Sequence, residues 1–577
     1  MFAVLAVILA FFIYFLNTKF MAYGLEFTDE GFYLNWISDP FSYEYGISNF
    51  GFFYYPFFKL LNENIVFLRQ FNVFLIGGLS FFVAFIALGK FIQTVGRKEK
   101  LLLSFALSSL SLSLYSGTIL FNPTPSYNDL NFIGLLVVLA GWLIGVEAKN
   151  AKLIFVSSFL IALGGLLLFH AKPSTAVLVG FAMLLIMLIR SNKRVFWVST
   201  SFVIFLVLLL LTSFYISSGP MGLIERYITA YEIQSYLKSG HEFFSLIRFD
   251  DFSFGKRTWL YFLLLFAFLV TYFYLENGDK SVVWHNSILF LLIGFLIYYV
   301  DSGQFFNAGY YQGVFLLLLS LSPLVYFYTV SLATKSTPSI KENFLILICF
   351  ILVYSYAFGT NNNYFIKYHI VFFFFALAGS VLLRNHISLR SALVFIIVLQ
   401  SVLILNLTKS YEYPYRQPQP LLDNTSHTKV HTSQLLLEKN FSDYIMEVGV
   451  VKSKTSATNY IDLSGQMPTL AYVLDLKPIG VAWLLGGYPG SYEFAYQVLS
   501  KAGCRRFENA ILLYESDGPR SIDISLLSEF GLDLERDFEL VHQTSSPAGA
   551  GGYQKPRKQY FYYSKTQNIK RYCNAPR

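Results

Sequence analysis

The residues best suited to chemistry are an acidic pair, Asp29 and Glu30, in the segment Phe27-Thr28-Asp29-Glu30-Gly31. The pair follows a hydrophobic N-terminal segment. Adjacent carboxylates beside a membrane span are costly to hold near apolar surface, so such groups usually serve a function. A carboxylate at this position can take a proton from an attacking hydroxyl group. We therefore expect Asp29 and Glu30 to form the catalytic centre.

Cations that could bind a phosphate-bearing substrate lie farther along the chain, near the ends of apolar segments. Transfer from a phosphate donor needs positive charge that stabilises the departing phosphate. The candidates are Lys172 and its neighbour His170, Lys367, Arg226 and Arg69. The alternative to a role in substrate binding is that each of these side chains simply extends toward the lipid headgroups, as is common at the ends of membrane spans.

Two further polar segments offer groups for substrate binding. Asn361 and Asn362 carry carboxamides suited to sugar hydroxyl groups, unless the segment is simply a turn. Asp129 is a possible second acid, which could orient an acceptor or hold a divalent metal together with Asp29. The alternative role of Asp129 is to cap the helix expected from residue 130.

The composition of the chain indicates a membrane protein. Of its 577 residues 14% are charged and the mean hydropathy is +0.52, whereas soluble proteins are about 25% charged. The apolar blocks are long enough to cross the ~30 Å hydrocarbon layer as helices, and open sheet edges cannot lie in lipid. We predict about thirteen spans, at roughly 2–20, 66–90, 101–119, 130–147, 153–169, 174–190, 195–217, 258–275, 284–300, 311–332, 343–359, 366–383 and 391–407.

The placement of Lys and Arg predicts the orientation of these spans. Every second loop is short and basic, as in Arg97-Lys98-Glu99-Lys100, and such loops stay cytoplasmic. The N-terminus is then cytoplasmic, while the long loops 23–64 and 218–257 and the region after the last span are external. The first segment lacks a basic start and a cleavage site, so we expect an uncleaved span and not a signal peptide.

We expect three regions: a membrane domain over residues 1–408, a proline-rich linker over 409–420, and an external soluble α/β domain with a basic tail over 421–577. Within the last region the pattern predicts a helix at 491–502 and strands at 510–514 and 559–563. Cys504 and Cys573 could pair outside the cell, whereas Cys349 lies in a span. The net charge of +8 follows from the basic loops and the tail, which is either solvated or in contact with membrane lipids, and it does not indicate a nucleic-acid partner.

The external position of the acidic pair limits the substrates. Nucleotide sugars and ATP are cytoplasmic, and the sequence contains no Walker or Rossmann phosphate loop. An activated group on the outer face must therefore arrive on a lipid, and a polyprenyl phosphate is the most plausible carrier.

These features resemble the GT-C superfamily of integral-membrane glycosyltransferases, in particular the branch of protein O-mannosyltransferases and lipid A aminoarabinose transferases. The resemblance rests on Asp29 and Glu30 in the first outer loop, on the expected span number and orientation, and on the external C-terminal region. It implies an inverting transfer from a polyprenyl-phosphate sugar to a lipid, glycan or protein acceptor, with Asp29 as the base or acceptor-positioning group. It also implies no cofactor; a divalent metal is possible but not favoured.

Two other functions stay open at this point. A polysaccharide polymerase or ligase has a similar span number, but typically uses arginine and histidine in a late outer loop. A flippase or transporter for lipid-linked saccharides needs ionisable side chains near the middle of the membrane. The expected span interiors are nearly free of such residues, which counts against transport.

Overall fold

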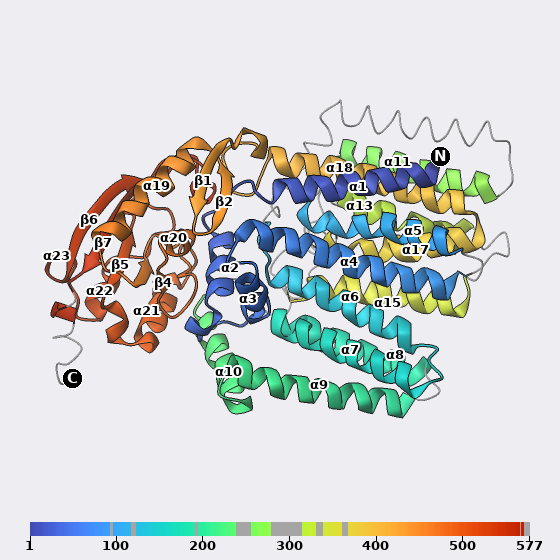
Figure 1. Ribbon diagram of the computed structural model, residues 1–577, viewed down its shortest axis with the longest axis horizontal. Coiled ribbons are helices and arrows are strands. Elements are labelled where there is room, and N and C mark those ends of the chain that lie inside the picture. Colours follow the sequence, from blue (N-terminus) through green and yellow to red (C-terminus); the bar gives the residue numbers. More distant parts are fainter. Residues whose placement is uncertain are drawn as a thin grey trace.

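The computed structural model describes residues 1–92, 96–116, 123–190, 194–237, 256–277, 314–330, 338–359, 367, 369–565 and 567–569. They form two parts: a bundle of long helices lying side by side, and a smaller α/β domain that covers one end of the bundle (Figure 1). The second part is built from the C-terminal region, as the sequence predicts.

Seven of the described helices are long and apolar enough to cross a membrane. They are α1 (Phe2–Phe20), α4 (Ile65–Phe91), α6 (Tyr127–Gly145), α7 (Ala151–Ala171), α9 (Arg194–Ile216), α15 (Ile340–Ala357) and α18 (Leu389–Glu412). Large apolar side chains on α9, such as Phe202 and Leu211, are about 60% exposed (60% and 61%). An apolar surface of this kind requires lipid around it. The chain is a polytopic helical membrane protein.

The other expected spans that fall on described residues coincide with helices outside these seven, several of which are short or interrupted. These are α5 (Arg97–Leu110) with the 3-10 turn η2 (Ser111–Tyr115), α8 (Pro173–Arg190), α11 (Lys256–Asn277), α13 (Val314–Ser320), α14 (Ser322–Val325) with the π-helical turn η5 (Tyr326–Val330), and η7 (His369–Val371) with α17 (Phe373–His386). Pro323 accounts for one interruption, since proline cannot continue the hydrogen-bond ladder of α13. The span expected at 284–300 lies outside the described residues.

The expected outer loop 23–64 is largely helical. It contains α2 (Asp29–Ser38), η1 (Pro40–Ser42) and α3 (Phe50–Leu60). Its aromatic residues form a small core in which Trp36, Phe50 and Phe52 are buried. The described part of the loop 218–257 forms α10 (Pro220–Ser235). These elements lie at the end of the bundle that the α/β domain covers (Figure 1).

The α/β domain is built on a five-stranded mixed sheet in the order β4-β3-β5-β7-β6. Strands β3, β4 and β5 are parallel, and β7 runs antiparallel to both β5 and β6. The strands are β3 (Asn459–Asp462), β4 (Lys477–Pro478), β5 (Ala510–Tyr514), β6 (Phe538–Ser545) and β7 (Lys558–Ser564), and the short helices around them are α20 (Thr469–Val473), α22 (Leu526–Glu529) and α23 (Leu534–Asp537), with the 3-10 turns η8 (Leu421–Asp423), η9 (Cys504–Phe507) and η10 (Ala550–Gly552).

Two longer helices cover opposite faces of this sheet. Successive side chains of a strand alternate between the faces. Ile511 and Leu513 of β5 belong to the hydrophobic cluster that contains α19 (Lys439–Lys454), whereas Leu512 belongs to the cluster that contains α21 (Ser491–Ala502). The helix expected at 491–502 and the strand expected at 510–514 are confirmed, and the strand expected at 559–563 lies within β7.

The α/β domain is joined to the bundle by main-chain hydrogen bonds as well as by the linker. A hairpin of β1 (Ser426–Val430) and β2 (Ser433–Leu437) follows the linker. Leu436 donates to the carbonyl oxygen of Ala22 and accepts from the amide of Gly24, both at 2.9 Å. The Ser433 hydroxyl accepts a 2.8 Å bond from the amide of Ile65, at the start of α4. The segment before α2 is therefore held by both parts of the chain.

The cysteines differ in state. Cys349 is a buried free thiol in α15, as expected for a residue within a span. Cys504 is bonded in a disulfide. Cys573, the residue with which the sequence would allow it to pair, lies outside the described residues.

Candidate functional site

The two acids of the pair occupy different environments although they are adjacent in the sequence. Both lie in the first turn of α2, where carboxylates are stabilised by the helix dipole. The side chain of Asp29 is 30% exposed, whereas that of Glu30 is 1% exposed. Of the two, only Asp29 is accessible to a substrate.

Glu30 forms a buried ion pair with Arg69 of α4. Its Oε1 also accepts from the Thr124 hydroxyl, and its Oε2 accepts from the amide of Glu26 at 2.8 Å. Arg69 in turn donates to the carbonyl oxygens of Met21 at 2.8 Å and Gly24 at 3.2 Å. The pair thus ties the chain before α2 to α4. The observed role of Glu30 and Arg69 is to position this segment.

Glu26 is a third carboxyl group at this place, and we did not predict it from the sequence. Its Oε1 accepts from the amide and hydroxyl of Thr28, at 2.8 and 2.5 Å, and its Oε2 accepts from the amide of Glu30 at 3.2 Å. Burial, and then the negative charge of Asp29, raise the pKa of Glu26 to about 8. The side chain is therefore mostly protonated at neutral pH.

Asp29 is held by two residues of the linker, 386 and 387 positions away in the sequence. Its Oδ2 accepts from the hydroxyl of Tyr415 at 2.7 Å and from Nη1 of Arg416 at 3.2 Å. The same Nη1 donates to the hydroxyl of Thr28. These bonds orient the carboxylate at the junction between the bundle and the α/β domain and leave part of it open.

Two lysines lie close to one another here: the buried Lys367 is within electrostatic range of Asp29, and the partly buried Lys172 is within range of Lys367. Lys172, between α7 and α8, donates a 3.1 Å bond to the carbonyl oxygen of Tyr356 in α15. Burial, reinforced by the positive charge of Lys367, lowers the pKa of Lys172 to about 7. Lys367 precedes α17 and lies outside the seven spans; burial lowers its pKa to about 8, and the charge of Asp29 opposes this shift. Asp29, Lys172 and Lys367 therefore form one electrostatic group.

Tyrosine side chains surround this group. The charge of Asp29 acts on Tyr33 of α2, whose pKa is raised well above its ordinary value, chiefly by burial. The ring of Tyr33 makes an edge contact with that of Tyr127 at the start of α6, with centroids 6.2 Å apart. These two tyrosine rings lie on the side of α2 and α6 near Asp29.

His170 and Arg226 lie in a second network, which joins α10 to α3 and α7. Arg226 donates from Nε to Oδ1 of Asn49 at 3.0 Å and lies over the ring of Trp36. The Tyr227 hydroxyl accepts from Asn49 at 2.9 Å and lies 3.4 Å from Nδ1 of His170. These bonds connect α10 to α3 and α7, which is a structural role.

Asp129 completes a capping box at the start of α6. Its Oδ2 accepts from the amide and hydroxyl of Ser126, at 2.9 and 2.6 Å, and its Oδ1 accepts from Nδ2 of Asn72 in α4 at 2.6 Å. These bonds match the capping role that the sequence left open for this residue. Asn361 and Asn362 lie outside the described residues.

The described residues contain no group of three His, Cys, Asp or Glu side chains placed to hold a metal ion. The three clustered carboxyl groups are instead neutralised separately. Glu30 pairs with Arg69, Asp29 pairs with Arg416, and Glu26 holds its proton.

The α/β domain contacts the acidic segment directly, through residues around Thr469. Thr469 donates from its hydroxyl to the carbonyl oxygen of Glu26 at 2.7 Å, and Nδ2 of Asn35 donates to the carbonyl oxygen of Pro468 at 3.0 Å. A Cβ atom on Gly31 would lie 2.1 Å from the Thr469 amide nitrogen, so only glycine allows this approach. No local sequence pattern specifies that Pro468 and Thr469 contact the acidic segment.

No protein-family model matches the chain, and neither a curated protein nor a solved structure matches it. The family resemblance therefore rests on the acidic pair and the expected topology. The fold itself is that of a polytopic helical membrane protein with a small C-terminal α/β domain.

The first prediction concerns the buried ion pair. Arg69→Met leaves the Glu30 carboxylate without its partner in a buried site, and we expect a loss of about 3–5 kcal/mol in the free energy of unfolding. The double variant Glu30→Gln with Arg69→Met should recover part of this loss. The measurement is chemical or thermal unfolding of the purified protein in detergent. Additive losses in the double variant would contradict a coupled pair.

The second prediction concerns Glu26 and pH. The pKa of a free glutamate carboxyl group is near 4.5, whereas the pKa of Glu26 in the folded protein is about 8. Between these values the folded state holds a proton that the unfolded state has released, so stability falls as the pH rises through this window. Glu26→Gln should reduce the fall, as measured by thermal unfolding from about pH 5 to 8. Asp462, whose pKa burial raises to about 7, contributes part of the slope that remains. An unchanged slope would show that Glu26 is ionised in the folded protein.

Proposed function

We propose that the protein is a glycosyltransferase that moves a sugar from a polyprenyl-phosphate donor to a lipid, glycan or protein acceptor at the outer face of the membrane. The observation that carries the proposal is the group formed by Asp29, Lys172 and Lys367. It combines a partly exposed carboxylate with the buried Lys367 and the partly buried Lys172 at one end of the bundle. This combination suits a transfer in which a hydroxyl group loses a proton and a phosphate departs.

In the proposed reaction the acceptor hydroxyl attacks the anomeric carbon from the side opposite the phosphate. Asp29 accepts the hydroxyl proton as the new carbon–oxygen bond forms. The bond between the anomeric carbon and the phosphate oxygen breaks, and its electron pair stays on the phosphate. Lys172 and Lys367 stabilise the charge of the departing polyprenyl phosphate, and the configuration is inverted. The two lysines supply positive charge of the kind that a metal ion would otherwise provide.

The roles of the two adjacent acids differ in this proposal. Asp29 has an accessible oxygen and touches the substrate. Glu30 is buried with Arg69 and positions the segment that carries Asp29. Tyr415 and Arg416 orient the Asp29 carboxylate, so the proposed site needs the linker as well as the bundle.

The external location of the site is supported by the distribution of basic residues. The ends of α5, α7, α15 and α17 that carry Lys98, Lys152, Lys341 and Arg384 are remote from the α/β domain (Figure 1). Basic residues remain on the cytoplasmic side, which would place Asp29 and the α/β domain outside. On that side a lipid-linked donor is available and nucleotide sugars are absent.

The third prediction tests the base. Asp29→Asn removes the proton acceptor and should reduce transfer roughly 100- to 10,000-fold, while the protein remains folded at its normal level in the membrane. The measurement is mass spectrometry of polyprenyl-phosphate sugars and surface glycans from cells that carry each variant. One lipid-linked sugar should accumulate as one surface modification is lost.

The matched control for this prediction is Asp39→Asn. Asp39 is the C-cap residue of the same helix, is 31% exposed and pairs with Lys477 at 2.7 Å. The Asp39→Asn substitution should leave transfer unchanged. Normal transfer by Asp29→Asn would remove the acidic pair from the mechanism. Unchanged lipid pools in a full deletion would remove the transferase function.

The fourth prediction tests the donor site. Lys172→Ala should raise the apparent KM for the lipid donor about tenfold or more, because a hydrogen bond to a charged phosphate is lost. In the wild type the charged fraction of Lys172 falls as the pH rises through about 7, so the KM should also rise with pH. Lys172→Arg keeps the charge and should flatten this dependence. If neither substitution changes the KM, Lys172 does not bind the donor and has a structural role at the end of α7.

A further inference from the structure

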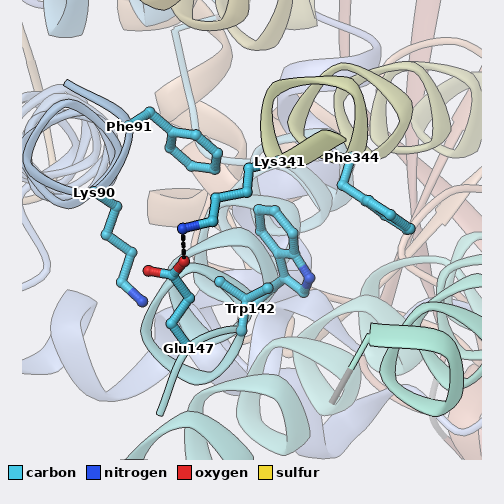
Figure 2. A pocket seen from close by; sticks show the side chains of 7 residues that line it. Lys90, Phe91, Trp142, Glu147, Lys341 and Phe344 are labelled. Atoms are coloured by element: carbon cyan, nitrogen blue, oxygen red, sulfur yellow. Dashed lines mark ion pairs between the residues drawn. The ribbon is translucent and has the colours of Figure 1, made fainter. Parts of the chain in front are cut away.

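A second polar site lies at the opposite end of the bundle, and the proposed reaction does not use it. There α4, α6 and α15 surround a hollow (Figure 2). The aromatic rings of Phe91, Trp142 and Phe344 form its walls, and Lys90, Glu147 and Lys341 form its rim.

The rim carries a net positive charge. Lys341 and Glu147 form an ion pair, and both side chains are about half exposed, at 57% and 44%. Lys90 extends toward Glu147 from the end of α4 (Figure 2) and donates a 3.4 Å bond to the carbonyl oxygen of Ile144. One carboxylate therefore faces two ammonium groups, and an anion between the lysines would complete the balance of charge.

The wall contains an unfilled hydrogen-bond donor. The side chain of Trp142 is 1% exposed, and its indole N–H has no acceptor among the residues that the structure describes. A buried donor without an acceptor is costly, and buried tryptophan N–H groups usually find one. The indole nitrogen lies on the edge of the ring that faces away from Lys90 and Glu147 (Figure 2), so its acceptor would be a part of a ligand other than a phosphate between the lysines.

The location of the hollow identifies the source of such a ligand. Lys90, Glu147 and Lys341 lie at the ends of helices long and apolar enough to span the membrane, at the level where lipid headgroups lie. Basic pockets between spanning helices bind anionic headgroups, and the aromatic walls provide an apolar surface for the acyl chains. We propose that this hollow binds the headgroup of an anionic membrane phospholipid, with its phosphate between Lys90 and Lys341.

The fifth prediction tests this lipid site on the full-length protein. The protein is exchanged into bilayers of phosphatidylcholine with phosphatidylglycerol, and the lipids it retains are measured by native mass spectrometry. Lys90→Ala and Lys341→Ala should each lower the retained phosphatidylglycerol about fivefold. Glu147→Gln should raise it, because it removes the negative charge of the rim. Trp142→Phe should lower it without a change in charge.

The control is Lys152→Ala, an exposed cation at the same end of the bundle that lies outside the hollow, and it should have little effect. Three results would overturn the proposal: an equal loss in the Lys152 variant, which would indicate diffuse attraction; no preference for phosphatidylglycerol over phosphatidylcholine; and displacement of the lipid by inorganic phosphate, which would indicate a soluble phosphate ligand.

Discussion

The buried ion pair between Glu30 and Arg69 determines where the acidic segment lies. A charged pair without water is stable only when its remaining hydrogen-bonding groups are satisfied, and here Arg69 also binds the carbonyl oxygens of Met21 and Gly24. The chain from Met21 to Glu30 is thereby held against α4. The α/β domain then pairs with the same segment through Leu436 and Thr469, so both parts of the protein share this constraint.

This arrangement separates the functions of neighbouring acids. Burial with Arg69 commits Glu30 to structure, and burial keeps the proton on Glu26, which leaves Asp29 as the carboxylate that faces the junction. Because Tyr415 and Arg416 of the linker hold Asp29, a movement of the linker relative to the bundle would also change the position of this carboxylate. The linker is thus part of the proposed site as well as a connection between the two domains.

Much of the fold could be predicted from local patterns. Residues 2–20 form α1 as expected, and the helix at 491–502 and the strand at 510–514 have the expected bounds, because hydrophobic period and length depend only on neighbouring residues. The two helices within 23–64 were not predicted, because their aromatic residues read as an apolar loop until they pack on one another. The span interrupted at Pro323 also differs from its prediction, since hydropathy does not register a break in the helix.

The sequence by itself determined that the chain crosses a membrane, that an acidic pair follows the first span, and that a soluble domain follows the last one. These properties depend on composition and on order along the chain. Only the tertiary structure decided which acid is accessible, that Asp129 caps a helix, that His170 and Arg226 join helices together, and that Lys367 lies near both Asp29 and Lys172. The physical reason is that burial and charge pairing arise from contacts between distant segments, such as the one between Asp29 and Arg416, and no local pattern of residues encodes them.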